Sequence, residues 1–360
     1  MPPGTSTRGV HTHSEILSQP DCWRACFRAL DEKDQIAQTC ARFPGRSDWI
    51  FVGCGTSYYI AQAAAASWIH ITGLRARALP ASEILLFPNL IACKGANYQP
   101  VLISRSGHTS EVIKAAEYLE LTSNIRTLAI SCATHQPLEE VCTATLYLPP
   151  ADEKSTVMTR SFTSMLLGLQ SLAAVYGNQA SLGEALRQLP AQAEPLLPQL
   201  ALQVQEFVES RTFADYVFLG QGPFFGIASE SMLKIKEMSC SYAQVFHTLE
   251  FRHGPKAIVS PEILVTFFIS ESGYEAEREV LQEIKSLGAT TLVVTNDADD
   301  TIRKAADLLV ELNLELPEYA RLAAFVLTGQ LLGYFTGIKK GFDPDQPRNL
   351  SRVVILDEKD

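Results

Sequence analysis

The chain contains two similar halves, and this repeat restricts its fold more than any other feature of the sequence. Three pairs of segments match: FVGCGTSYYIA from Phe51 and FLGQGPFFGIA from Phe218, ISRSG from Ile103 and ISESG from Ile269, and TLAIS from Thr127 and TLVVT from Thr291. Their starting positions differ by 167, 166 and 164 residues. Because the displacement stays nearly constant through three successive apolar runs, it predicts a duplicated structural unit rather than a solenoid of short repeats.

Short apolar runs alternate with helical stretches in each half, which is the pattern of a parallel sheet covered by helices on both faces. We expect strands near residues 49–53, 100–104, 126–131 and 145–148, and again near 215–219, 264–269, 290–295 and 308–311. We expect helices near 57–73, 109–120, 136–141 and 160–176, and again near 224–239, 274–287, 299–306 and 317–338. The predicted class is therefore α/β, with two parallel sheets flanked by helices.

The length of 360 residues and the 46% hydrophobic content allow two cores of ordinary size. Residues 12–42 read as one or two helices, and residues 191–210 as a connecting helix with prolines near its start. The predicted organisation is an N-terminal helical segment at 1–45, a first domain at 46–178, a connecting helix at 179–212, a second domain at 213–340 and an extended tail at 341–360.

Charge and cysteine content exclude several classes of protein. A net charge of −10 argues against a broad basic surface for nucleic acid or anionic lipid, although a small phosphorylated ligand needs only a local positive potential. The eight cysteines show no CxxC pair, so we expect reduced thiols and no metal site. The N-terminus has no signal-peptide pattern, and no stretch approaches the length of a membrane span, which predicts a cytoplasmic protein.

The segment VLISRSGHTSE, residues 101–111, begins as a buried strand and then places Ser104, Ser106 and Thr109 around Gly107, directly before a predicted helix. Ligands bind beyond the carboxyl ends of parallel strands, where the first amides of a helix attract an anion. Small hydroxyl side chains add donors, and glycine permits a close approach, so the segment suits a phosphate. The alternative is that these residues only cap the helix.

A second loop of this kind is GCGTS at 53–57, where Thr56 and Ser57 open a helix. Tyr58 stands where a dinucleotide-binding fingerprint requires its third glycine, and no segment matches a nucleotide-binding P-loop. Neither NAD nor ATP is therefore expected, and no cofactor is predicted. Two hydroxyl-bearing loops on neighbouring strands are able to hold one phosphate between them.

Several motifs resemble the tandem sugar isomerase (SIS) domains of glucosamine-6-phosphate synthase. They are GCGTSYY, ISRSGHTSE, ASE at 81–83, ESMLKIKE at 230–237, FRHGP at 251–255 and DPDQPRNL at 343–350. EKSTVMTRSFTSM at 153–165, the run into FRHGPK and HSEILSQPDCW near the N-terminus are more similar to galactosamine-6-phosphate deaminase/isomerases, also called tagatose-6-phosphate ketose/aldose isomerases. The motifs occur in family order from about residue 13 onward. The resemblance implies two SIS domains, each a flavodoxin-like three-layer sandwich.

The resemblance also implies which residues hold the substrate. The positions that match the phosphate-binding residues of the synthase are Thr56, Ser57, Ser104, Arg105, Ser106 and Thr109. Met158 stands where the synthase has a serine in its substrate loop, so that contact is not carried over. Thr159, Arg160 and Lys234 remain possible substrate contacts.

Catalysis of this type needs a base that moves a proton between C1 and C2 of an open-chain sugar, and a group that opens the ring. The resemblance puts Glu237 in the first role and His253 in the second, at the family's separation of 16 residues. Glu230, Lys234 and Glu237 share one helical face, and charges at such spacing are otherwise typical of a solvated salt-bridging face. A lone His-Gly-Pro is otherwise most often a turn. In the synthase the neighbouring subunit contributes the histidine, which implies a homodimer with a shared site.

The tail departs from the synthase, because Arg352 stands where the synthase has the lysine that forms a Schiff base. A guanidinium stays protonated and is a poor nucleophile, although Arg352 is able to ion-pair with a phosphate or carboxylate. No glutaminase domain is expected either. Three reactions through an enediol or enaminol remain open: deamination with isomerisation of an amino-sugar phosphate, cleavage of a 6-phosphofructosamine, and plain aldose/ketose isomerisation. Lys339 and Lys340 lie near the tail, but solvated helix-end lysines explain them better.

A protein that senses phosphosugars without converting them is the alternative from a different class, because SIS domains also serve in regulators. Such a protein retains the hydroxyl-bearing loops and loses the catalytic pair. Glu237 and His253 are both present here, and no basic helix-turn-helix precedes residue 45. The sequence therefore favours the enzyme.

Overall fold

The protein is described by a computed structural model at residues 8–45, 47–91 and 97–356. The chain forms two compact units, which we call the first and second unit. Of the described residues, the first unit comprises those within 21–153, 160–187 and 351–356, and the second those within 8–20, 154–159 and 188–350, so the chain passes between units more than once.

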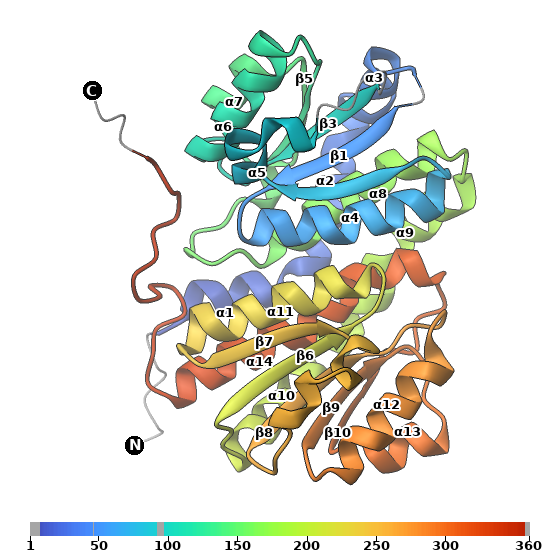
Figure 1. The fold of residues 1–360 in the computed structure, drawn as a ribbon, viewed down its shortest axis with the longest axis vertical. Helices are drawn as coiled ribbons and strands as arrows, with labels where there is room; N and C mark the ends of the chain where they lie inside the picture. Colours follow the sequence, from blue (N-terminus) through green and yellow to red (C-terminus); the bar gives the residue numbers. More distant parts are fainter. Residues whose placement is uncertain (1–7, 46, 92–96, 357–360) are drawn as a thin grey trace. The chain divides into compact units, whose positions relative to one another are not determined.

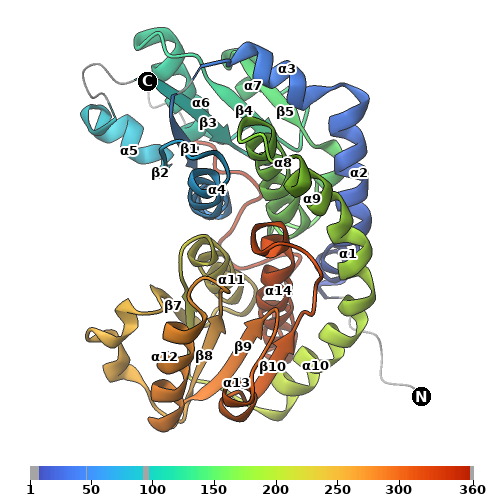
Figure 2. The same ribbon diagram turned by 90° about the vertical axis from the view of Figure 1, so that its right-hand side faces the viewer.

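The first unit contains a five-stranded parallel sheet in the order β2-β1-β3-β4-β5 (Figures 1 and 2). Its strands are β1 (Asp48–Gly53), β2 (Ala76–Pro80), β3 (Tyr98–Ile103), β4 (Leu128–Ser131) and β5 (Ala144–Tyr147). Its helices include α2 (Gln19–Glu32, from Asp21 on), α3 (Gln35–Arg42), α4 (Thr56–Thr72), α5 (Ala81–Leu86), α6 (Ser110–Glu117), α7 (Pro137–Val141) and α8 (Arg160–Tyr176).

Alternating side chains of the strands build two cores in the first unit. Ile50 and Val52 of β1 pack with the buried residues of α5, α6 and α7. Trp49 and Phe51 point to the opposite face, where their rings contact Trp68 of α4. Because side chains alternate along a strand, one buried strand supplies both layers, and the three-layer sandwich follows.

The second unit contains a parallel sheet in the order β10-β9-β8-β6-β7, which is the first sheet's order when it is read from the other edge (Figure 1). Its strands are β6 (Asp215–Gly220), β7 (Tyr242–His247), β8 (Ile263–Phe268), β9 (Thr290–Thr295) and β10 (Leu308–Glu311). Its helices include α1 (Val10–Leu17), α10 (Leu197–Ser210), α11 (Phe224–Ser239), α12 (Tyr274–Ser286), α13 (Asp300–Ala305) and α14 (Leu322–Lys339). The matching topology confirms the predicted duplication.

The eight predicted strands are all present, but each sheet has a fifth strand that the sequence pattern did not reveal. These are the half-exposed edge strands β2 and β7, whose ARALP and YAQVFH segments lack a continuous apolar run. The region before β1 forms three helices rather than one or two, and two helices, α9 (Ala180–Ala193) and α10, replace the single connecting helix.

The most apolar helix is α14, and the segment Glu318–Lys339 is long and apolar enough to cross a membrane. The expectation that no stretch approaches this length was therefore wrong. The segment's most apolar window is 78% buried within the protein, and α14 packs against α10 and α11. A core helix of this length is the simpler explanation, because a buried helix is apolar on all sides.

Candidate active site

The loops after β1 and β3 lie at the point of the first sheet where the strand order reverses. In a 2-1-3-4-5 sheet, the chain leaves these two neighbouring strands toward opposite faces, and the crevice beyond their carboxyl ends is the usual ligand site. The first loop leads into α4, where Thr56 and Ser57 are buried. The second leads into α6 and contains Ser104 and Arg105, also buried, and Ser106, which is half-buried. The topology thus brings both predicted phosphate loops to one edge of one sheet.

The hydroxyls of the second loop do not cap α6. Thr109 occupies the N-cap position, but its side chain makes no capping hydrogen bond and instead lies 3.2 Å from the hydroxyl of Ser104. The Ser106 hydroxyl accepts from the amide of His108 at 3.2 Å. Within the described residues, the Ser106 amide has no hydrogen-bond partner. The Ser106 amide, in the loop before the helix, is thereby left for a ligand.

Gly107 shapes this loop. Its φ of 63° is in the left-handed region, and a Cβ atom there would lie 2.7 Å from the Cβ of Gln136. A side chain at this position is therefore excluded both by backbone conformation and by space. The sequence predicted Gly107 as a residue that lets a phosphate approach the backbone. The structure shows that the conformation and packing of the loop also require glycine at this position.

Arg105 points into the protein rather than to solvent. Its Nη1 lies 3.5 Å from Oε2 of Glu153, and its Nη2 donates to the carbonyl of Arg352 at 2.9 Å. Glu153 is fully buried and also accepts from the amide and hydroxyl of Ser161 at the start of α8. Arg105 therefore joins the phosphate loop, α8 and the C-terminal tail. Its direct contact with a phosphate stays a prediction.

Two further arginines gather beside Arg105, around Asp152. Nη2 of Arg352 lies 2.6 Å from the Asp152 carboxylate, and the guanidinium of Arg160 donates to the Asp152 carbonyl. The amide of Ser110, at the start of α6, donates to the carbonyl of Val354 at 3.3 Å. The tail that carries Arg352 thus runs along the start of α6, within the same unit as the phosphate loops.

In the second unit, α11 carries the predicted base within a buried ionic cluster. The Nζ of Lys234 lies 3.1 Å from Oε1 of Glu230 and 2.5 Å from Oε2 of Glu237. Lys234 and Glu230 are fully buried, and the Glu237 side chain is 18% exposed. The alternative of a solvated salt-bridging face is therefore wrong. Burial alone lowers the pKa of Lys234, but the two carboxylates outweigh it and raise that pKa, so the ammonium stays charged.

Small residues of α14 make room for this cluster. Gly329, Gly333 and Gly337 follow one another at intervals of four and face α11. A Cβ at Gly333 would lie 2.9 Å from the backbone carbonyl of Lys234, and a Cβ at Gly337 would lie 2.3 Å from the backbone oxygen of Met238. The two helices are therefore in backbone contact along the segment that carries Lys234. The sequence shows this spacing, and we did not use it as a signal.

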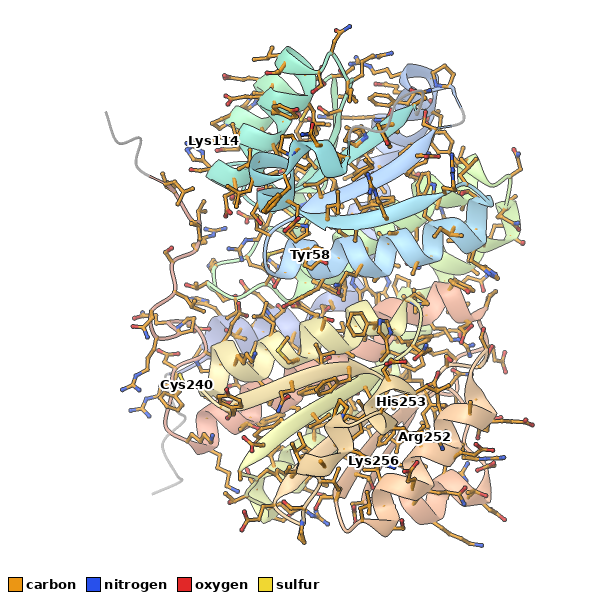
Figure 3. The ribbon with its side chains drawn as sticks, viewed as in Figure 1. Tyr58, Lys114, Cys240, Arg252, His253 and Lys256 are labelled. Atoms are coloured by element: carbon orange, nitrogen blue, oxygen red, sulfur yellow. The ribbon has the colours of Figure 1, made fainter. Side chains whose placement is uncertain are left out.

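His253 lies on an exposed loop of the second unit, immediately after the short helix Glu250–Arg252 (Figure 3). Ion pairs anchor both sides of the loop to Glu283 of α12, through Arg252 at 2.8 Å and through Lys256. These cations, Lys256 first, lower the pKa of Glu283. Among the described residues, His253 and Glu237 do not contact each other. The imidazole is thus held on a fixed loop that faces solvent in the single chain.

Thr159 is buried, and its carbonyl accepts from Nε2 of Gln330 at 3.1 Å. The loop before it is held by Glu15 of α1, whose carboxylate accepts from the amides of Lys154 at 2.5 Å and Ser155 at 3.4 Å, and from the Ser155 hydroxyl. Glu15 is buried, with only 5% of its surface exposed. Sequence reasoning missed this function of Glu15, although the residue lies in the HSEILSQP segment that resembles the family.

Two observations bear on other chemistry at the site. Burial, together with the neighbouring Glu111, raises the pKa of Cys54 in the loop after β1 to about 12, so this cysteine is a thiol rather than a nucleophilic thiolate. The described residues contain no cluster of three or more histidine, cysteine or acidic side chains suited to a metal ion. The seven cysteines among the described residues are free thiols.

Comparison with known proteins matches both halves of the chain to the SIS domain, at residues 46–175 and 215–333. The glutamine--fructose-6-phosphate aminotransferase [isomerizing] of Xylella fastidiosa is 31% identical over 97% of this chain, which spans 58% of that protein. The structure of glucosamine-6-phosphate deaminase from Thermotoga maritima is 28% identical, with a TM-score of 0.77, over 96% of this chain and all of that one.

The fold likeness extends to tagatose-6-phosphate ketose/aldose isomerase from Escherichia coli, which has a TM-score of 0.86 at 21% identity over 99% of this chain and 98% of that one. By name, these relatives are an aminotransferase, a deaminase and a ketose/aldose isomerase, each named for a hexose or amino-sugar 6-phosphate. The chain belongs to the SIS domain family, with one SIS domain in each half.

Proposed function

We propose that the protein converts an amino-sugar or ketose/aldose 6-phosphate, by isomerisation coupled to deamination, through proton transfer by Glu237 and ring opening by His253. The observation that carries this proposal is the buried Lys234, whose ammonium lies 2.5 Å from the Glu237 carboxylate. A buried ion pair of this kind is costly to build and is frequent at functional sites. The names of the relatives support the same reaction class.

The phosphate group is assigned to the hydroxyl-bearing loops of the first unit. The amide of Ser106 and the hydroxyls of Thr56, Ser57, Ser104 and Thr109 offer donors, and the first turns of α4 and α6 offer positive dipole ends. A phosphate dianion accepts hydrogen bonds at all its oxygens and suits such a set. Arg105, Arg160 and Arg352 supply the positive charge beside it.

The proton transfer needs no oxidant and no cofactor. In an open-chain 2-amino aldose, the Glu237 carboxylate removes the proton from C2, and the enaminol that results accepts a proton at C1. The product is a C2 imine, to which water adds at C2 before ammonia leaves, so that a ketose phosphate remains. A simple aldose or ketose undergoes the same proton shift through an enediol.

Arg352 supports a reaction without a covalent intermediate. A guanidinium does not form a Schiff base, and this one is held by Asp152 at 2.6 Å. Deamination through an imine of the substrate itself uses no enzyme amine. We therefore favour deamination or isomerisation over synthesis of the amino sugar.

The dimer and the shared site belong to the proposal as well. His253 is exposed on a loop that ion pairs of Arg252 and Lys256 hold to α12, so a second subunit has access to it. We propose that the imidazole opens the sugar ring in the site of a homodimer partner.

The decisive experiment offers the protein glucosamine-, galactosamine- and fructosamine-6-phosphates and several hexose 6-phosphates, and follows ammonia, free amino acid and ketose. Ammonia and ketose from an amino-sugar phosphate support the proposal. Release of an amino acid from a fructosamine would replace it with a deglycase, and binding of sugar phosphates without turnover would replace it with a sensor. The Glu237→Gln variant is the control, because it removes the base and leaves the phosphate loops intact.

A further inference from the structure

The second copy of the phosphate loop, at residues 269–273, is built differently from the first. ISESG follows β8 as ISRSG follows β3, so Ser270, Glu271 and Ser272 correspond to Ser104, Arg105 and Ser106. Both loops lead into a helix, α12 and α6 respectively. If the duplicated loop has retained the geometry that attracts an anion, the same donors must find an anionic partner here too.

That partner is a carboxylate from the same chain. Glu318 stands in the short helix before α14, 47 residues after Glu271. Its Oε1 accepts from the amide of Glu271 at 2.6 Å and from the amide of Ser272 at 3.4 Å, and its Oε2 accepts from the Ser272 hydroxyl at 2.8 Å. In the first copy, the corresponding amide of Ser106 has no partner among the described residues.

A second carboxylate completes the set from beneath the loop. Glu277 of α12 is fully buried and accepts from the amide of Ser270 at 3.2 Å and from its hydroxyl at 2.7 Å. Three successive amides and two serine hydroxyls therefore all donate to carboxylates. The loop thus directs a set of donors at carboxyl oxygens, and the oxygens of a phosphate are able to accept from the same donors.

The charged pair beside the loop is reversed between the copies. Arg105 pairs with Glu153, seven residues before α8 begins, whereas Glu271 pairs with Arg321, directly before α14. The two loop positions differ by 166 residues and the two partner positions by 168. An ion pair thus anchors the middle residue of both loops, with its charges exchanged, and the arginine predicted to help a phosphate in the first copy is replaced by an acid in the second.

We propose that the loop 270–273 is a second oxyanion-binding site whose resident ligand is the carboxylate of Glu318. The chain then has two anion-binding loops, one after β3 and one after β8, and only the loop after β3 is available to a phosphate. The second is occupied from within, and it ties the start of α14 to the end of β8. Without the Glu318 side chain, the loop accepts a small oxyanion such as inorganic phosphate or sulfate. Ser272 and Glu271 are exposed within the unit, so an ion reaches the loop from solvent.

The test is rescue of a Glu318→Ala variant by inorganic phosphate. Thermal unfolding of wild type, Glu318→Ala and the control Glu315→Ala is measured against phosphate, with chloride at matched ionic strength. We expect the midpoint of Glu318→Ala to fall by about 2–4 °C, and phosphate to restore that loss while it leaves Glu315→Ala unchanged relative to wild type. Adding Ser272→Ala to Glu318→Ala should abolish the rescue.

An equal phosphate response in all three proteins would overturn the proposal. If Glu318→Ala does not fold without phosphate, refolding with and without phosphate decides the question, and Glu318→Gln, which keeps the volume and one acceptor oxygen, should show a smaller rescue. Failure of both variants to respond to phosphate also overturns it. Binding at the first loop raises all midpoints alike, so the excess response of Glu318→Ala is independent of the proposed function.

Discussion

The ammonium of Lys234 is fully buried and lies 2.5 Å from Oε2 of Glu237, whose side chain is 18% exposed. One side of the carboxylate is therefore fixed by a charge that water does not screen, and the other side remains accessible. This is the arrangement expected of a base that must keep one orientation and still reach a substrate. The carboxylate of Glu230 forms a second ion pair with the same ammonium, at 3.1 Å.

Replacing Lys234 should lower the rate by releasing the carboxylate of Glu237. We expect Lys234→Met, combined with Glu230→Gln so that no buried carboxylate is left unpaired, to lower kcat and to leave KM nearly unchanged. The Glu237 carboxylate then loses the ammonium at 2.5 Å that holds it in one orientation. The measurement is kcat and KM for wild type, the double variant and Glu230→Gln alone. An unchanged kcat in the double variant would contradict the role of Lys234.

Lys234→Met alone should unfold more easily than the double variant, because one partner of a buried ion pair is then left without its counter-charge. The loss is on the order of 3–5 kcal/mol in the free energy of unfolding. Urea unfolding of the two proteins separates this structural effect from the effect on the rate.

Gly333→Ala should disturb the same cluster from the neighbouring helix. The new Cβ would lie 2.9 Å from the backbone carbonyl of Lys234, so α11 and α14 must move apart. We expect a loss of about 1–3 kcal/mol in the free energy of unfolding together with a lower kcat. Gly183→Ala in α9 is the matched control, because its Cβ has an ordinary 3.9 Å contact and should stabilise the helix by about 0.5–1 kcal/mol.

Equal effects of the two glycine substitutions on kcat would show that close packing of α14 on α11 does not position Glu237. Circular dichroism of both variants confirms that helix content is retained before the rates are compared.

The sequence predicted the strands that carry the site and missed those at the sheet edges. β1, β3, β6 and β8 are buried on both faces, so their residues form continuous apolar runs. β2 and β7 are half-exposed, and Tyr242 at the start of β7 is 73% exposed, so alternating polar residues conceal them. The repeat implies that the two sheets share one strand order, but it does not reveal the fifth strand of each sheet.

The candidate site was predictable in its residues but not in its environment. Charges at positions 230, 234 and 237 have the spacing of a solvated helix face, and only the glycines of α14 reveal that the face is covered. The carboxylates of Glu15 and Glu318 reach loops that are 139 and 47 residues away in the chain. Contacts between segments so distant leave no periodic signal in a sequence, which is why local patterns did not find them.

Ser106→Ala and Ser272→Ala form a matched pair, since the two serines hold the same place in the two copies. Ser106→Ala should raise KM for a sugar phosphate about 10-fold, which is the worth of one hydrogen bond to a charged group, and leave the unfolding midpoint nearly unchanged. Ser272→Ala should lower the midpoint and leave KM unchanged, because its hydroxyl binds Glu318. Steady-state kinetics and thermal unfolding of both variants check this. A higher KM in Ser272→Ala would contradict the assignment of the sugar phosphate to the loop that contains Ser106.

Glu277 should make the stability of the protein depend on pH between about 5 and 8. Burial raises the pKa of this carboxyl to about 7, against hydrogen bonds from Ser270 that lower it, and the ordinary value is 4.5. Because the folded-state pKa is the higher one, the folded protein binds the proton more tightly. The stabilisation is complete below pH 4.5 and is lost as the pH rises through 7, by about 3 kcal/mol in all.

Glu277→Gln, which cannot ionise, should remove this dependence. The free energy of unfolding of the variant relative to wild type is expected to rise by about 3 kcal/mol between pH 5 and pH 8. The measurement is urea unfolding at several pH values, with Glu275→Gln on the exposed face of α12 as the control that should run parallel to wild type. Parallel curves for Glu277→Gln and wild type would mean that the buried carboxyl ionises as easily in the folded chain as in the unfolded one.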